Sequence, residues 1–79
     1  MAKAKRITLY TTARCPVCDQ AKRYLKQRGI AFVEFDVQRS KRGIKDFQRL
    51  GGRGVPIIMV GDRRLDGFDK QAFEAIYKD

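Results

Sequence analysis

One pattern constrains the fold of this 79-residue chain more than any other, because a strand, a helix and a second strand follow within about 30 residues. Apolar and polar side chains alternate over residues 6–10 and again over 32–37, which is typical of strands. Between them, Pro16 suits a first helical turn and Gly29 suits a helix end. This unit predicts two parallel strands joined by a right-handed crossover, with a frayed segment over residues 1–6 ahead of it.

Local signals in the second half predict a helix, a hairpin and a final helix. Ser40 is a candidate N-cap, and the helix after it is expected to turn Ile44, Phe47 and Leu50 inward, although Gly43 weakens it. The apolar run 57–60 is typical of a strand covered on both faces, and a turn then leads into a short edge strand over 63–65.

Asp69 is a candidate N-cap for the final helix. The predicted order is β-α-β-α-β-β-α. The sequence therefore predicts a single α/β domain over residues 1–79, in which three helices flank a four-stranded mixed sheet.

Composition excludes several kinds of protein. The chain has 18 basic residues, 9 acidic residues and no histidine, so catalytic pairs and metal sites that need histidine are impossible. We expect no membrane span and no secretory signal, because no apolar run is long enough.

The net charge of +9 is concentrated in residues 1–28 and 39–53, which indicates either attraction of an anionic partner or a solvated surface. Two cysteines allow one disulfide at most, which favours a reducing cytoplasm.

The motif Cys15-Pro16-Val17-Cys18 places two thiols at the start of the first predicted helix. Residues three apart on a helix lie about 5–6 Å from each other, which suits a disulfide. Unpaired N–H groups and the helix dipole favour a thiolate there, so we expect a lowered pKa for Cys15, with Arg14 adding positive charge. Cys15 is the predicted nucleophile, and Cys18 is expected to be more buried and to resolve the mixed disulfide.

Two other interpretations of the cysteines are a metal site and an inert core pair. A closed zinc site needs four ligands, and this chain supplies two cysteines, so only a dimer or borrowed ligands would complete it. Two core cysteines that bracket a proline at a strand-to-helix turn fit chance poorly. The sequence therefore favours thiol–disulfide chemistry with no bound metal.

Two further segments are candidates for substrate binding. A cis bond before Pro56 would leave the backbone of Val55 free to pair with an extended substrate, but a trans proline at a strand start fits the sequence equally well. Gly67 allows close approach of a ligand, and Asp69 is able to accept from an ammonium group. Taken alone, the same segment is better explained by a turn glycine, a core Phe68 and a helix cap.

Taken together, four segments in register resemble the glutaredoxins of the thioredoxin-fold superfamily: residues 7–11, 15–18, 54–58 and 65–69. The resemblance covers residues 7–77. It implies a thioredoxin-like fold, the reduction of disulfides and of protein–glutathione mixed disulfides, and a cis proline at position 56. It also implies a cytoplasmic monomer that uses glutathione as co-substrate and holds no tightly bound cofactor.

The resemblance also assigns roles to individual residues. It makes Cys15 the nucleophile and Cys18 the resolving cysteine, and it offers the Val55 backbone to the cysteinyl part of glutathione. The γ-glutamyl end is expected at the segment after the last strand. The expected binding residues are Arg14, Val17, Val55, Pro56, Gly67, Phe68 and Asp69.

Three positions depart from the common pattern of the family. Val17 replaces a frequent tyrosine, Thr12 replaces a lysine common in glutathione users, and Asp66 replaces a glycine. Arg14 and Arg53 are candidates to supply the missing charge.

These departures keep other functions open. One is a glutaredoxin-like donor that is recharged by thioredoxin reductase and delivers electrons to ribonucleotide reductase. Another is a dimeric carrier of a glutathione-ligated [2Fe–2S] cluster. A basic nucleic-acid binder is the least favoured, because Tyr24 and Phe47 are better explained as core.

Overall fold

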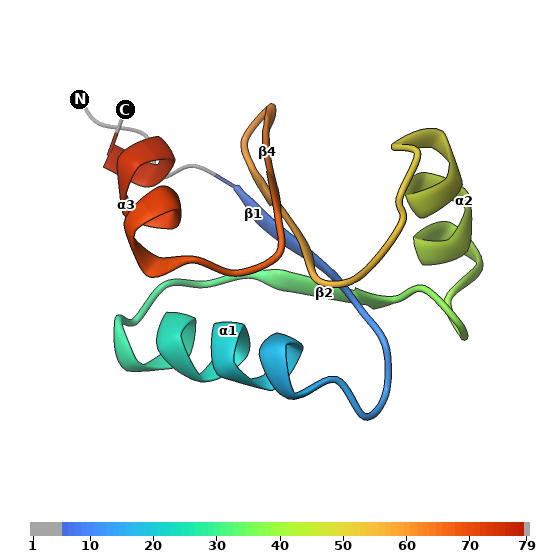
Figure 1. The fold of residues 1–79 in the computed structure, drawn as a ribbon, viewed down its shortest axis with the longest axis horizontal. Coiled ribbons are helices and arrows are strands. Elements are labelled where there is room, and N and C mark those ends of the chain that lie inside the picture. Colours follow the sequence, from blue (N-terminus) through green and yellow to red (C-terminus); the bar gives the residue numbers. More distant parts are fainter. Residues whose placement is uncertain (1–5, 79) are drawn as a thin grey trace.

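The computed structural model describes residues 6–78, so the predicted frayed residues 1–5 lie outside the described part of the chain. Figure 1 shows a four-stranded sheet with α1 and α3 on one side and α2 apart from them. The sheet has the order β2-β1-β3-β4. The elements are β1 (Ile7–Thr11), α1 (Pro16–Gln27), β2 (Val33–Asp36), α2 (Lys41–Arg49), β3 (Ile57–Val60), β4 (Arg63–Asp66) and α3 (Lys70–Lys78).

The predicted strand–helix–strand unit is confirmed. β1 and β2 are parallel, with Thr8 opposite Val33, and α1 connects them. β3 then runs antiparallel to β1, and the hairpin places β4 at the edge of the sheet. The strand bounds differ from the prediction by about one residue, because Thr11 still pairs with Asp36 and so extends β1 beyond Tyr10.

The main core lies between the sheet and the pair α1 and α3. Its fully buried side chains come from β1, α1, β3 and α3: Ile7, Leu9, Ala21, Leu25, Ile58, Val60 and Phe73. Tyr24 links the two helices, because its ring meets the ring of Phe73 edge-on at 5.8 Å between centroids. Among residues 6–78, no helix combines the length and the apolar character that crossing a bilayer requires.

The second helix packs differently from the prediction. Ser40 caps it as expected, since its hydroxyl accepts from the Gly43 N–H at 3.0 Å. The buried residues of α2 are Gly43 and Asp46, whereas the apolar residues expected inside, Ile44, Phe47 and Leu50, are only half-buried. Gly43 is buried because the helix lies directly on β2. A Cβ at Gly43 would stand 3.0 Å from both the Asp36 carbonyl oxygen and the Phe35 Cβ.

We predict that Gly43→Ala destabilises the protein although alanine favours helices. The gain in helix propensity is about 1 kcal/mol, whereas overpacking costs about 1–3 kcal/mol. The Asp36 carbonyl has little room to move, because it accepts from the Ser40 N–H at 2.8 Å. Urea denaturation is expected to show a loss of about 1 kcal/mol in the free energy of unfolding. Gln48→Ala, at an exposed position of the same helix, is the control and should change it by less than about 0.5 kcal/mol. A Gly43→Ala protein as stable as the parent would contradict this packing.

Asp46 is a buried carboxylate, 8% exposed, that α2 presents to the sheet. The Tyr10 hydroxyl donates to its Oδ2 at 3.1 Å, and Arg49 donates to its Oδ1 at 2.7 Å. Arg42 lies 3.6 Å away on the exposed side. Burial raises the pKa of Tyr10, and the hydrogen bond to Asp46 raises it further. The phenol therefore keeps its proton to higher pH in the folded protein than in the unfolded chain.

This difference predicts a loss of stability at alkaline pH. Above about pH 10 the unfolded tyrosine loses its proton while the folded one retains it, so the free energy of unfolding falls as pH rises. Tyr10→Phe should make this fall less steep in denaturation experiments between pH 9 and 11. The free energy of unfolding of Tyr10→Phe should still fall somewhat with pH, because the pKa of Lys22 is also raised in the folded protein. An unchanged slope in Tyr10→Phe would show that Tyr10 does not carry the effect.

Candidate active site

The two cysteines meet at the beginning of α1. Cys15 is the N-cap residue and Pro16 occupies the first turn, where its missing N–H costs nothing. The sulfurs are bonded to each other, with 5.2 Å between the Cα atoms, so the structure shows the oxidised form. The Cys18 N–H donates to Cys15 Sγ at 3.1 Å. The outer sulfur therefore sits where the helix offers an unpaired N–H group and the positive end of its dipole.

The two thiols differ in exposure as predicted. Cys18 is 1% exposed, whereas Cys15 is half-buried and accessible from the rim of the site. Val17, between them, is 41% exposed. Cys15 is therefore the more accessible of the two cysteines.

Arg14 adopts a backbone conformation that side chains rarely take. Its φ is +58°, in the left-handed region, and its side chain is exposed next to Cys15. This conformation turns the chain from the end of β1 into the helix. A residue other than glycine costs about 1–2 kcal/mol there.

We predict that glycine at position 14 gives a more stable protein than alanine. Both substitutions remove the guanidinium, but only glycine removes the steric cost, so Arg14→Gly should exceed Arg14→Ala by about 1 kcal/mol in free energy of unfolding. Ala13→Gly serves as the control, because Ala13 is exposed and has no positive φ, and glycine should bring no gain there. Equal stability of the two Arg14 variants would contradict the backbone strain.

The Val55–Pro56 bond is cis, which the sequence left open. Pro56 is buried and immediately precedes β3, whose Ile57 pairs with Tyr10 near the end of β1. Within residues 6–78, the N–H and C=O of Val55 make no backbone hydrogen bond. The backbone of Val55 is therefore unpaired beside the end of β1 that leads to Cys15.

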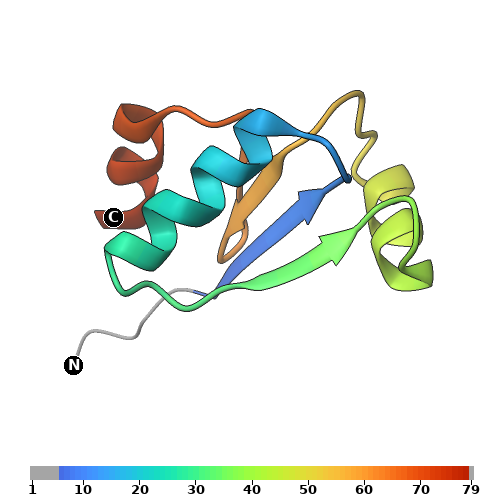
Figure 2. The same cartoon turned by 90° about the horizontal axis from the view of Figure 1, so that it is seen from below.

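The segment after β4 is attached to the same end of the sheet. The Gly67 N–H donates to the Pro56 carbonyl at 2.8 Å, and Gly67 has a φ of +82°. Phe68 packs on Tyr24 with 5.5 Å between ring centroids, and Asp69 caps α3 through its Oδ1, 2.9 Å from the Gln71 nitrogen. The turn, core and cap roles are thus confirmed. Figure 2 shows this segment running alongside the start of α1.

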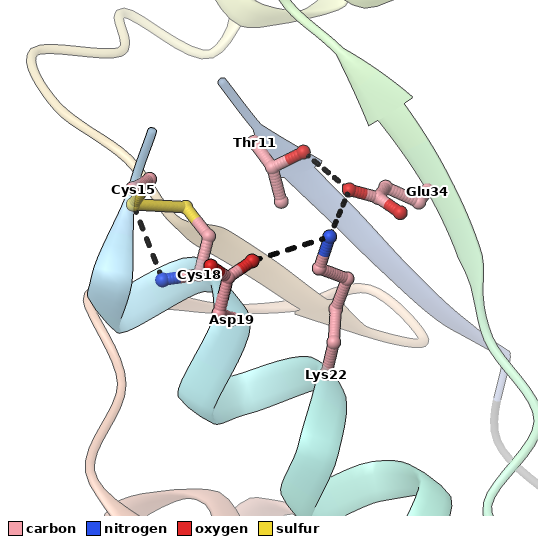
Figure 3. The surroundings of a disulfide bond; sticks show 6 residues. All are labelled: Thr11, Cys15, Cys18, Asp19, Lys22 and Glu34. Carbon is pink, nitrogen blue, oxygen red and sulfur yellow. Dashed lines mark hydrogen bonds and ion pairs between the residues drawn. A yellow bond between two sulfur atoms is a disulfide. The ribbon is translucent and has the colours of Figure 1, made fainter. Parts of the chain in front are cut away.

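A polar network beside the disulfide was not predicted. Lys22 Nζ lies 3.1 Å from Glu34 Oε2 and 3.6 Å from Asp19 Oδ1, and the buried Thr11 donates to the same Glu34 oxygen at 2.7 Å (Figure 3). The hydrogen bond to Glu34 is the main cause of the raised pKa of Lys22. The network joins α1, β1 and β2 one turn below Cys18. Only the Asp19–Lys22 spacing is visible in the sequence, because the pairing with Glu34 depends on the packing of α1 against β2.

Arg53 and Asp66, both named in the comparison with the family pattern, line the same cavity. Arg53 lines a cavity of about 510 Å³ together with Gly51, Arg64 and Asp66. The Asp66 carboxylate is held there by the Arg64 Nε at 2.9 Å. Its charge is therefore partly offset by that arginine. Among residues 6–78, no three cysteine, aspartate or glutamate side chains gather as a metal site would require.

The residues that form this geometry lie within a match to a known protein family. The glutaredoxin family model matches residues 7–65, a span that includes both cysteines and Pro56. The chain belongs to the glutaredoxin family. Its members are thiol–disulfide oxidoreductases, in agreement with the paired sulfurs at the start of α1. The thioredoxin-like fold and the order of elements expected from the sequence are likewise confirmed.

The relatives of this chain include both glutaredoxins and glutaredoxin-like proteins. A glutaredoxin of Neisseria meningitidis is 38% identical over 64 residues, which are 78% of this chain and 75% of the relative. The glutaredoxin-like protein NrdH of Escherichia coli is 33% identical over 63 residues, 80% of this chain and 78% of the relative.

Solved structures with a similar fold include an NrdH-redoxin and a thioredoxin-like protein. The structure of Escherichia coli NrdH-redoxin, described as having a thioredoxin-like activity profile, has a TM-score of 0.78 and 30% identity, covering 90% of this chain and 93% of that one. The thioredoxin-like protein BC3987, as its T8A mutant, has a TM-score of 0.85 at 22% identity, covering 92% and 95%, which shows the shared fold.

Proposed function

We propose that this glutaredoxin reduces protein disulfides and glutathione mixed disulfides through Cys15 and Cys18, in a reducing cytoplasm. The observation that carries the proposal is the placement of the half-buried Cys15 at the N-cap of α1, with the sulfur of the buried Cys18 bonded to its own. The Cys18 N–H that reaches Cys15 Sγ in the disulfide is positioned to stabilise a Cys15 thiolate after reduction. The absence of histidine fits a mechanism that needs no general base.

The reaction proceeds in two exchanges. The Cys15 thiolate attacks one sulfur of the substrate disulfide, the substrate S–S bond breaks, and the departing sulfur leaves as a thiolate that takes up a proton. Cys18 then loses its proton and attacks Cys15 Sγ, which releases the second substrate thiol and forms the Cys15–Cys18 disulfide. Two electrons pass from the protein to the substrate.

The free backbone of Val55 supports binding of an extended substrate by added-strand pairing. Glutathione has a peptide-like cysteinyl part that fits this backbone, and the N-terminal end of α3 beside Gly67 and Asp69 suits its γ-glutamyl end. Glutathione is accordingly the proposed co-substrate, with Arg14 and Val17 at the rim of the site.

A second electron source is supported by the likeness to NrdH. The solved NrdH-redoxin has a thioredoxin-like activity profile, and Thr12 stands where glutathione users commonly have lysine. In this alternative, thioredoxin reductase recharges the disulfide, and ribonucleotide reductase is a candidate acceptor.

A paired assay separates the two sources. The oxidised protein is supplied with NADPH and either glutathione plus glutathione reductase or thioredoxin reductase, and NADPH consumption is followed with a protein disulfide as final acceptor. Glutathione is expected to sustain turnover if it is the co-substrate. Turnover with thioredoxin reductase alone would assign the protein to the alternative.

Cysteine variants test the mechanism itself. Cys15→Ser should abolish disulfide reduction, because the attacking sulfur is lost. Cys18→Ser should accumulate a mixed disulfide on Cys15, detectable by mass spectrometry as an added substrate mass, because the resolving step is blocked. Full reductase activity in Cys15→Ser would reject the proposed roles.

A further inference from the structure

A groove between α1 and the start of α3 takes no part in the steps above. Its volume is about 220 Å³, and its lining residues are Gln20, Arg23, Tyr24, Gln27, Phe68 and Lys70. The rings of Tyr24 and Phe68 contact each other there. The Lys70 ammonium lies 5.9 Å from the centroid of the Tyr24 ring. The groove therefore combines an aromatic surface with polar and cationic side chains.

The charge of this groove is positive and not neutralised. Arg23 and Lys70 are exposed, and neither forms an ion pair within the described residues 6–78. None of the six lining residues is acidic. Two acids nearby already have partners, since Glu74 pairs with Arg28 and accepts from the hydroxyl of Tyr24, a lining residue, and Asp19 pairs with Lys22.

Asp69 is the remaining acid at this groove, and it borders Lys70. Its Oδ1 accepts from the Gln71 N–H at 2.9 Å and lies 3.5 Å from the Ala72 nitrogen. The carboxylate is therefore occupied by the first turn of α3. It does not form an ion pair with either groove cation within residues 6–78.

Two of the lining residues, Phe68 and Gln20, lie close along the chain to residues of the redox site. Phe68 directly follows Gly67, which is bonded to the carbonyl of the cis proline. Gln20 lies one helical turn after the exposed Val17 on α1. A chain bound across Cys15 can therefore continue from the site into the space between α1 and α3.

We propose that this groove binds an acidic segment of the protein substrate, next to the cysteine that Cys15 attacks. Substrate carboxylates contact Arg23 and Lys70, and an apolar substrate side chain lies against Phe68. Charge complementarity selects this occupant, because two unpaired cations flank an aromatic surface without a lining carboxylate. The inference rests on the proposed disulfide chemistry and adds the class of substrate to it.

Single-turnover kinetics test the proposal without a recycling partner. Reduced protein is mixed with three peptides that carry the same cysteine as a 2-pyridyl disulfide, flanked by acidic, neutral or basic residues. The acidic peptide is expected to react about tenfold faster than the neutral one at low salt, and the advantage should shrink as salt rises.

Charge-reversal variants locate the effect. The double variant Arg23→Glu/Lys70→Glu should lose the preference for the acidic peptide. Lys41→Glu/Lys45→Glu changes the net charge equally at exposed positions of α2 and should keep the preference. Equal rates for all three peptides, or an equal loss in the α2 variant, would overturn the groove as the docking site.

A binding measurement separates this proposal from the chemistry. An acidic peptide with serine in place of its cysteine should shift the backbone amide resonances of Arg23, Phe68 and Lys70. If these shifts are absent, the docking site is wrong even when all peptides are reduced. If the shifts occur but no peptide disulfide is reduced, the docking site stands and the proposed disulfide chemistry fails.

Discussion

The position of one sulfur at a helix start is the constraint on which the active site depends. Cys15 caps α1 with its side chain, and the Cys18 N–H donates to its sulfur. A helix leaves its first N–H groups without partners, and an acceptor with negative charge is favoured there. Pro16 occupies the first turn of the helix, so Cys15, Pro16 and Cys18 together set the geometry of the disulfide and the electrostatic surroundings of the Cys15 sulfur.

The proposed substrate-binding surface depends on the order of the strands. β3 runs antiparallel to β1, so the beginning of β3 lies beside the end of β1 that leads to Cys15. The Val55 backbone makes no backbone hydrogen bond at this place within residues 6–78, and the Gly67–Pro56 hydrogen bond brings the segment before α3 to it. Three segments far apart in the sequence thereby form one site.

The basic residues that give the chain its positive charge have different roles in different parts of the structure. Part of it is structural, because Arg49 and Arg42 neutralise the buried Asp46, and Lys22 is held by Glu34 below the disulfide. Arg23 and Lys70 form no ion pair within residues 6–78, and they flank an aromatic groove between α1 and the start of α3. Net charge alone does not distinguish these uses, because it carries no information on which acids lie nearby.

The sequence by itself determined whatever depends on neighbours along the chain. The start of α1 at Pro16, the cap at Ser40 and the redox pair all follow from residues within one helical turn. The core pattern of the strands followed too, since alternation of side chains is a local property.

Only the tertiary structure decided the burial of Asp46 in place of Ile44, Phe47 and Leu50, the isomer of the Val55–Pro56 bond, and the ion pair of Lys22 with Glu34. Each of these depends on how closely two segments distant in sequence approach each other. Local propensity carries no information about that distance.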